Sequence, residues 1–202
     1  MKDRGRTEQK ILDAVGKIVK EKDFDALGIN AIAEEAGVAK VLIYRYFGNF
    51  EGLLREWALG THYWPTQVET GTPDFSSLSL LEVKKKAEEV FIGQLDSLEK
   101  KDLLRKIIRW HLSSGHPVSK EIMAKVEEDG IHLMDAFKSR CDSELDLDAL
   151  ISILIGGIYY LSLISDQADV FNTIPLNHPE GRMRIRDGIS QWLDMLFKEI
   201  RD

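Results

Sequence analysis

The 202-residue chain has 44% hydrophobic and 30% charged residues, a composition typical of folded soluble proteins that excludes an intrinsically disordered chain. Its only cysteine, Cys141, excludes an internal disulfide framework, and the charged N-terminus lacks the apolar stretch of a signal peptide, so we expect a cytoplasmic protein. The net charge of −7 is uneven: residues 1–54 hold nine basic and nine acidic side chains, so the whole acidic excess follows them. A neutral head on an acidic body can orient a protein on DNA.

The first predicted helix runs from about residue 7 to residue 21 and begins after Thr7, with Glu8 in its first turn. Ile11, Val15 and Ile18 recur at helical spacing and predict a buried face. A second helix is predicted over residues 29–35, with Gly28 as its N-cap residue.

A tight turn follows the second predicted helix. Gly37 stands where a helix commonly ends in a left-handed residue, a conformation that glycine adopts without steric cost. A third helix is predicted from Ala39 to Tyr46. Two short helices joined by a glycine turn form a helix-turn-helix, whose second helix typically enters the DNA major groove.

This segment resembles the DNA-binding domain of the tetracycline-repressor (TetR) family of bacterial transcriptional regulators. The resemblance covers residues 7–54, and the shared features are Ile32-Ala33, Ala36-Gly37-Val38, Tyr44, Phe47 and Leu53-Leu54. It implies a double-stranded DNA operator, a small-molecule effector bound in the C-terminal body, and a homodimer in which the last two long helices form a four-helix bundle with their copies.

Four positions depart from the family pattern. Family members often have Ser or Thr in place of Ala39, small or hydroxyl residues in place of Val41 and Leu42, and Lys in place of Phe50. Ala39 cannot cap the third helix, and apolar side chains at 41 and 42 can contact only thymine methyl groups or protein. The residues predicted to contact DNA are Lys40 and Tyr44, supported by Arg45, Asn30 and Val41, with Thr7 and Asn49 at the flanks.

The rest of the chain is predicted to be helical throughout. Apolar periodicity predicts helices near residues 51–62, 78–98, 103–112, 118–140, 149–165 and 185–196. No segment has the alternation of a strand, and Ser143 with Asp146 resembles a capping box. We therefore predict an all-α protein of about nine helices: a three-helix DNA-binding head over residues 1–50 and a ligand-binding and dimerisation domain over residues 51–202.

Residues 149–165 form an uncharged run that approaches the length of a membrane span. Aspartates flank the run on both sides, and serines and tyrosines lower its hydrophobicity, so we predict no membrane contact. A helix that is apolar on most sides must be covered on more than one of them. We expect a homodimer through the helices near 146–166 and 180–200, with Gly156-Gly157 permitting close approach.

The sequence predicts neither an enzyme nor a metal or cofactor site. It lacks a nucleophile motif, a glycine-rich phosphate loop and closely spaced zinc ligands; His111 and His116 lie five residues apart across a break. Aromatic and polar residues on otherwise apolar helices are candidates for the effector site, although an aromatic or Met residue at such a position is more often part of the core: Trp64, Phe91, Gln94, Trp110, His111, Met123, Met134, Tyr159 and Tyr160.

We thus expect a dimeric, ligand-responsive transcriptional regulator, a repressor that binds a palindromic operator and is released by a small molecule. The alternative is a helical dimer with a degenerate helix-turn-helix that binds a protein partner or a ligand in place of DNA. The apolar residues at positions 39, 41, 42 and 50 favour this alternative.

Overall fold

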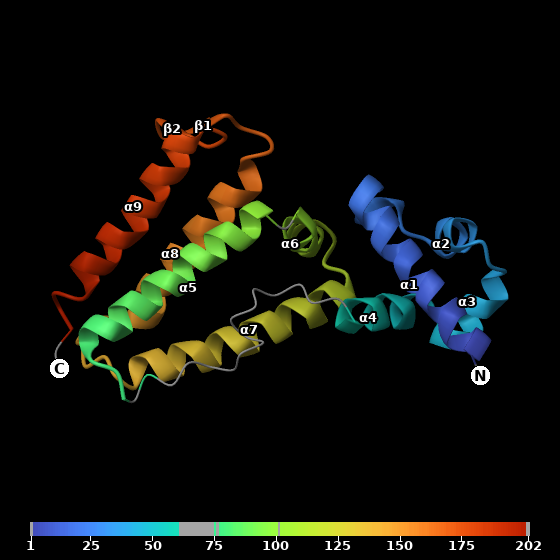
Figure 1. Cartoon of the computed structure of the whole chain (residues 1–202), viewed down its shortest axis with the longest axis horizontal. Coiled ribbons are helices and arrows are strands. Elements are labelled where there is room, and N and C mark those ends of the chain that lie inside the picture. The colour runs from blue at the N-terminus through green and yellow to red at the C-terminus, as the bar shows by residue number, and fades with distance from the viewer. Residues whose placement is uncertain (1, 61–74, 76, 101, 201–202) are drawn as a thin grey trace. The chain divides into compact units, whose positions relative to one another are not determined.

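The computed structural model describes residues 2–60, 75, 77–100 and 102–200 (Figure 1). Over these residues the chain forms nine α-helices, one short 3-10 helix and one two-stranded hairpin, which confirms the all-α class. The elements in chain order are α1 (Lys2–Lys22), η1 (Phe24–Ala26), α2 (Ile29–Ala36), α3 (Lys40–Phe47), α4 (Phe50–Gly60), α5 (Leu80–Lys100), α6 (Asp102–Ser114), α7 (Pro117–Lys138), α8 (Leu147–Ile164), β1 (Val170–Phe171), β2 (Ile174–Pro175) and α9 (Pro179–Leu196).

The chain divides into two compact units. The first contains residues 1–63 and 102–125, and the second contains residues 64–101 and 126–202. Helices α4 and α6 and the first residues of α7 therefore cluster with the N-terminal helices. The predicted boundary at residue 50 rests on expected function and not on compactness, and it stays a prediction.

The first unit is built around a core of branched aliphatic side chains. Ile11 and Val15 of α1, Ile32 of α2, Ile43 of α3 and Leu53 of α4 are all fully buried. These helices are held at fixed angles because interiors pack as densely as organic crystals.

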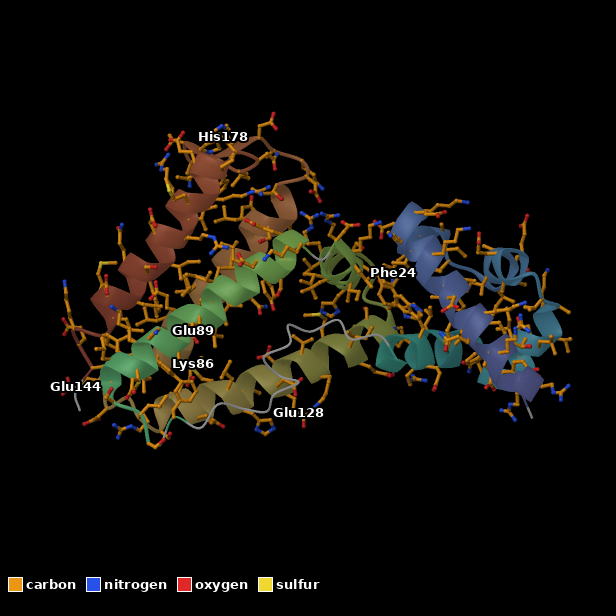
Figure 2. The ribbon with its side chains drawn as sticks, viewed as in Figure 1. Phe24, Lys86, Glu89, Glu128, Glu144 and His178 are labelled. Atoms are coloured by element: carbon orange, nitrogen blue, oxygen red, sulfur yellow. The ribbon has the colours of Figure 1, made fainter. Side chains whose placement is uncertain are left out.

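Aromatic rings extend the same core. Phe24, labelled in Figure 2, stacks on Trp110 of α6 with ring centroids 4.3 Å apart and meets the edge of Trp57 at 6.0 Å. The Nζ atom of Lys106 in α6 donates hydrogen bonds to the carbonyls of Val19 and Lys20 in the last turn of α1. These contacts attach α6 to the helices of the head.

The prediction that the first helix begins after Thr7 is wrong, since α1 begins at Lys2. Two contacts stabilise the extra turn. Arg4 donates to the Glu8 carboxylate one turn later at 2.8 Å, and its guanidinium lies 5.4 Å from the Tyr46 ring centroid. The second contact comes from α3, so the pattern of the first residues alone does not reveal it.

The second unit contains α5, α8 and α9, and α5 packs against both of the others (Figure 1). Its buried face carries Val83, Phe91 and Leu95. Ion pairs connect α5 to α9, from Lys84 to Asp194 and from Arg186 to Asp96. These two ion pairs fix where α9 lies along the length of α5.

Two local predictions in this unit are wrong. Asp146 is not the third residue of a capping box: it is itself the N-cap of α8, where its Oδ1 accepts the Ala149 amide at 3.0 Å. A short antiparallel hairpin, β1–β2, also precedes α9. Its turn residues, Asn172 and Thr173, have positive φ angles of 43° and 68°, as two-residue hairpin turns require. A strand of two residues is too short to show alternation.

Candidate nucleic-acid interface

The turn between α2 and α3 has the geometry that the sequence predicts. Gly37 adopts a left-handed conformation, with φ at 64°, and its amide donates to the carbonyls of Ala33 and Glu34. The next amide, of Val38, also donates to the Ala33 carbonyl, at 3.0 Å. These bonds satisfy the last carbonyls of α2 and end that helix, so the chain can turn into α3.

The buried side of α3 fixes its rotation in the first unit. Ile43 is fully buried against the core, and the Gly48 amide closes the helix by donating to the Tyr44 carbonyl at 2.9 Å. As predicted, Gly28 is the N-cap residue of α2, and Ala39 provides no side-chain cap for α3.

The opposite side of α3 is exposed and carries four of the predicted DNA-contacting residues. Lys40, Val41, Tyr44 and Arg45 stand at positions that share one side of a helix, and all four are exposed. We call these four residues the reading face. Val41 is 66% exposed and Tyr44 52% exposed. Leu42, on another side of the helix, is half-buried.

Two arginines gather around Tyr46, the last residue of the third predicted helix. The guanidinium carbon of Arg45 lies 5.8 Å from the Tyr46 ring centroid, and that of Arg4 lies 5.4 Å from it. Both distances fall within the range of a cation–π contact. Glu8 raises the pKa of Arg4 through a hydrogen bond and through its charge. The ring thus holds a cation from α1 and a cation from α3 at one edge of the reading face.

The start of α4 is also set by specific contacts. The side chain of Asn49, one of the predicted DNA contacts, caps α4 by accepting the Gly52 amide at 2.7 Å. Gly52 itself was not identified as important from the sequence. A Cβ atom on it would lie 2.2 Å from the Phe47 carbonyl oxygen, so this position requires glycine. The close approach fixes α4 against the end of α3.

The remaining predicted DNA contacts lie on α1 and α2. Thr7 is half-buried in the second turn of α1, and Asn30 is exposed in the first turn of α2. An ion pair of 2.6 Å between Lys17 and Glu35 ties α1 to α2 and therefore helps to place Asn30.

The candidate effector residues are distributed over both units. Trp110, His111 and Met123 belong to the first unit, whereas Phe91, Gln94, Met134, Tyr159 and Tyr160 belong to the second; Trp64 lies outside the described residues. Trp110 is part of the aromatic core, and the His111 ring lies 3.4 Å from the Ser119 hydroxyl. Among the described residues, no group of three metal-ligating side chains comes together.

Within the second unit, two of the candidates form one polar pair. The Gln94 amide of α5 donates to the Tyr159 hydroxyl of α8 at 2.8 Å. Burial raises the pKa of Tyr159 to about 12, against the opposing effect of the Gln94 bond. Tyr160 turns elsewhere: it is 51% exposed and packs edge-on against Phe171 of the hairpin. The adjacent tyrosines thus have different surroundings.

The comparison with protein families agrees with this geometry. Residues 11–57 match the family model described as bacterial regulatory proteins, tetR family. The match begins inside α1 and ends inside α4, so it includes the whole helix-turn-helix. None of the curated proteins compared with the chain matches it.

Solved structures share the fold over nearly the whole chain. A TetR-family transcriptional regulator from Haemophilus influenzae has 16% identity and a TM-score of 0.58, with both chains covered in full. The transcriptional regulator FadR from Bacillus subtilis, in complex with stearoyl-CoA, has 17% identity and a TM-score of 0.61, covering 92% of this chain and 96% of that one. NalD of Pseudomonas aeruginosa, the secondary repressor of a multidrug efflux pump, has 16% identity and a TM-score of 0.58, covering 98% and 97%. Residues 11–57 thus match the DNA-binding domain of the tetR family, and the chain as a whole shares the fold of solved TetR-family transcriptional regulators.

Proposed function

We propose that this chain is a homodimeric, cytoplasmic transcriptional repressor that binds a palindromic operator through residues 1–50. A small molecule bound by residues 51–202 releases it from DNA, and no catalysis is involved. The observation that carries the proposal is the reading face: four exposed side chains on a helix whose opposite side is buried in the core. An exposed face on the second helix of a helix-turn-helix is suited to the major groove.

The exposed side of α8 supports the homodimer. Within the described residues, α8 is the one helix long and apolar enough to cross a membrane, yet only 22% of it is buried inside the chain. Ile153 is 72% exposed, and Gly156 and Gly157 are exposed beside it. Apolar surface of this extent is normally covered, and a two-fold axis lets one patch cover its own copy. A dimer would also bring two heads, each without net charge, onto one operator.

The Gln94–Tyr159 pair supports an effector site in the second unit. Phe91, three residues before Gln94 in the same helix, is buried. Small-molecule sites commonly combine an apolar lining with a few placed polar groups. The solved FadR structure holds stearoyl-CoA, and by analogy we propose for this chain an effector with an apolar part.

Binding to the DNA upstream of the chain's own gene tests the DNA-binding proposal. We expect affinity that falls steeply as salt rises, because cations released from phosphates drive the association. Lys40→Ala and Tyr44→Ala should each weaken binding at least severalfold without changing the sedimentation of the protein. Lys120→Ala, which removes an exposed cation of α7, serves as the control.

The same titrations separate the proposal from its alternative. If the parent protein binds no DNA even at low salt, the helix-turn-helix is degenerate and a protein or ligand partner is favoured. If both variants bind as tightly as the parent, the assignment of Lys40 and Tyr44 is wrong.

A further inference from the structure

The reading face has an apolar side chain at its centre. Val41 stands between Tyr44 and Arg45 around the helix, with Lys40 beyond Tyr44. It is 66% exposed, whereas Ile43, two residues later, is fully buried. A β-branched residue on the open side of a DNA-reading helix lacks a role in the packing of its own unit.

The position of Val41 is rigid. It lies in the first turn of α3, whose rotation is set by Ile43 and whose end is closed at Gly48. A valine side chain in a helix has essentially one χ1 rotamer, so its two methyl groups occupy fixed positions. Val41 therefore presents a fixed apolar surface and loses little conformational entropy on binding.

The chemistry of the major groove limits what such a surface can contact. Base edges there are hydrogen-bond donors and acceptors, with one apolar exception, the C5-methyl group of thymine. A valine facing any other base edge would bury a polar atom without a partner, at a cost in free energy. Residues near the start of a recognition helix are the ones that reach base edges.

We infer that Val41 determines operator specificity by packing against a thymine methyl group in each half-site. The inference rests on the proposed DNA-binding function and adds the base that the reading face selects. Tyr44 and Lys40 supply hydrogen bonds on one side of this contact. Arg45 lies beside the Tyr46 ring with Arg4, at the rim of the face, and is placed to bind phosphate.

Replacement of thymine by deoxyuridine tests the inference, because it removes the methyl group and leaves the hydrogen-bonding pattern unchanged. The probe is a duplex that the parent protein enriches from a random pool, with each thymine replaced in turn. We expect one position in each half-site at which the parent loses about fourfold in affinity, the effect of exposing one apolar carbon.

Variants at position 41 assign that loss to Val41. Val41→Ala and Val41→Ser should bind the thymine duplex severalfold more weakly than the parent does. Each variant should bind the deoxyuridine duplex as tightly as it binds the thymine duplex. Leu112→Ala removes another exposed apolar side chain, 70% exposed on α6, and should keep the parent's sensitivity. Helical content measured by circular dichroism verifies that the variants fold.

The possible failures are distinguishable. A parent protein that tolerates deoxyuridine at every position overturns the inference, and so does an unchanged deoxyuridine penalty in Val41→Ala. In both cases the proposed function stands, because the parent still binds the duplex. A parent protein without salt-dependent binding to any duplex overturns the proposed function and, with it, the inference.

Discussion

Arg55 of α4 donates two hydrogen bonds to the Glu121 carboxylate of α7, from Nε at 2.6 Å and from a terminal nitrogen at 2.7 Å. The two residues are 66 positions apart in the chain. A two-pronged bond of this kind fixes direction as well as distance. It ties the helix that follows the reading face to the first part of α7.

This pair predicts a pH dependence of stability. The Arg55 hydrogen bond lowers the pKa of Glu121 from its ordinary value of 4.5, aided by the charge and opposed by desolvation. Because the folded-state pKa is lowered, the contribution to stability is complete above about pH 4.5 and disappears as the pH falls through the folded-state value.

Thermal melts of the parent and of Glu121→Gln from acidic to neutral pH measure this effect. The parent should melt at a slightly higher temperature near neutrality, and the two curves should converge in acid. The difference is small because both side chains are solvent-exposed. Glu34→Gln, which changes an exposed side chain of α2, is the control. A difference in melting temperature between the parent and Glu121→Gln that is the same at every pH would contradict the prediction.

Gly52→Ala tests the close approach of α4 to α3. The added Cβ would lie 2.2 Å from the Phe47 carbonyl oxygen, so we expect a loss of about 1–3 kcal/mol in the free energy of unfolding. Gly5→Ala, in α1 with open space at its Cβ position, should stabilise the protein by up to about 1 kcal/mol. Urea denaturation measures the free energy of unfolding of both variants. A stabilised Gly52→Ala variant would show that the backbone at Phe47 shifts to accommodate the added Cβ.

Gly156→Ala tests the proposed dimer, because the change should stabilise the single chain and weaken the association of two chains. Within one chain nothing lies within 4 Å of a Cβ atom at Gly156, so alanine should stabilise α8 by about 1 kcal/mol. If two copies of α8 approach each other there, the same change weakens association. Sedimentation over a range of concentrations should show a weaker dimer for Gly156→Ala and an unchanged dimer for Gly130→Ala on α7. Unchanged association in both variants would place the contact elsewhere.

Tyr159→Phe tests the polar pair of the second unit. The variant loses the hydroxyl that accepts the Gln94 bond, at an expected cost of about 0.5–1.5 kcal/mol. In the parent, the pKa raised to about 12 keeps the folded-state phenol protonated where the unfolded-state phenol ionises, so stability falls between about pH 10 and pH 12.

The alkaline loss of stability should shrink in Tyr159→Phe. Tyr160→Phe, which changes the exposed neighbour, should keep the parent's alkaline behaviour. Unfolding free energies measured in urea across this pH range distinguish the two variants. Equal alkaline slopes for the parent and Tyr159→Phe would assign the loss to other groups.

The sequence by itself determined the helix-turn-helix. Apolar spacing, Gly37 and the Asn49 cap act within a few residues of one another, so local pattern is enough to place α2, α3 and the start of α4. The four residues of α3 that the sequence named for DNA contact are exposed, and the structure added the burial of Ile43 on the other side.

Tertiary structure decided the features that join distant residues. The extra turn of α1 depends on Tyr46, and the attachment of α4 to α7 depends on Glu121. Neither of these partners is marked in the sequence near the residue that it fixes. Periodicity records which side of a helix is buried, whereas the identity of the neighbour is set only when the helices pack together.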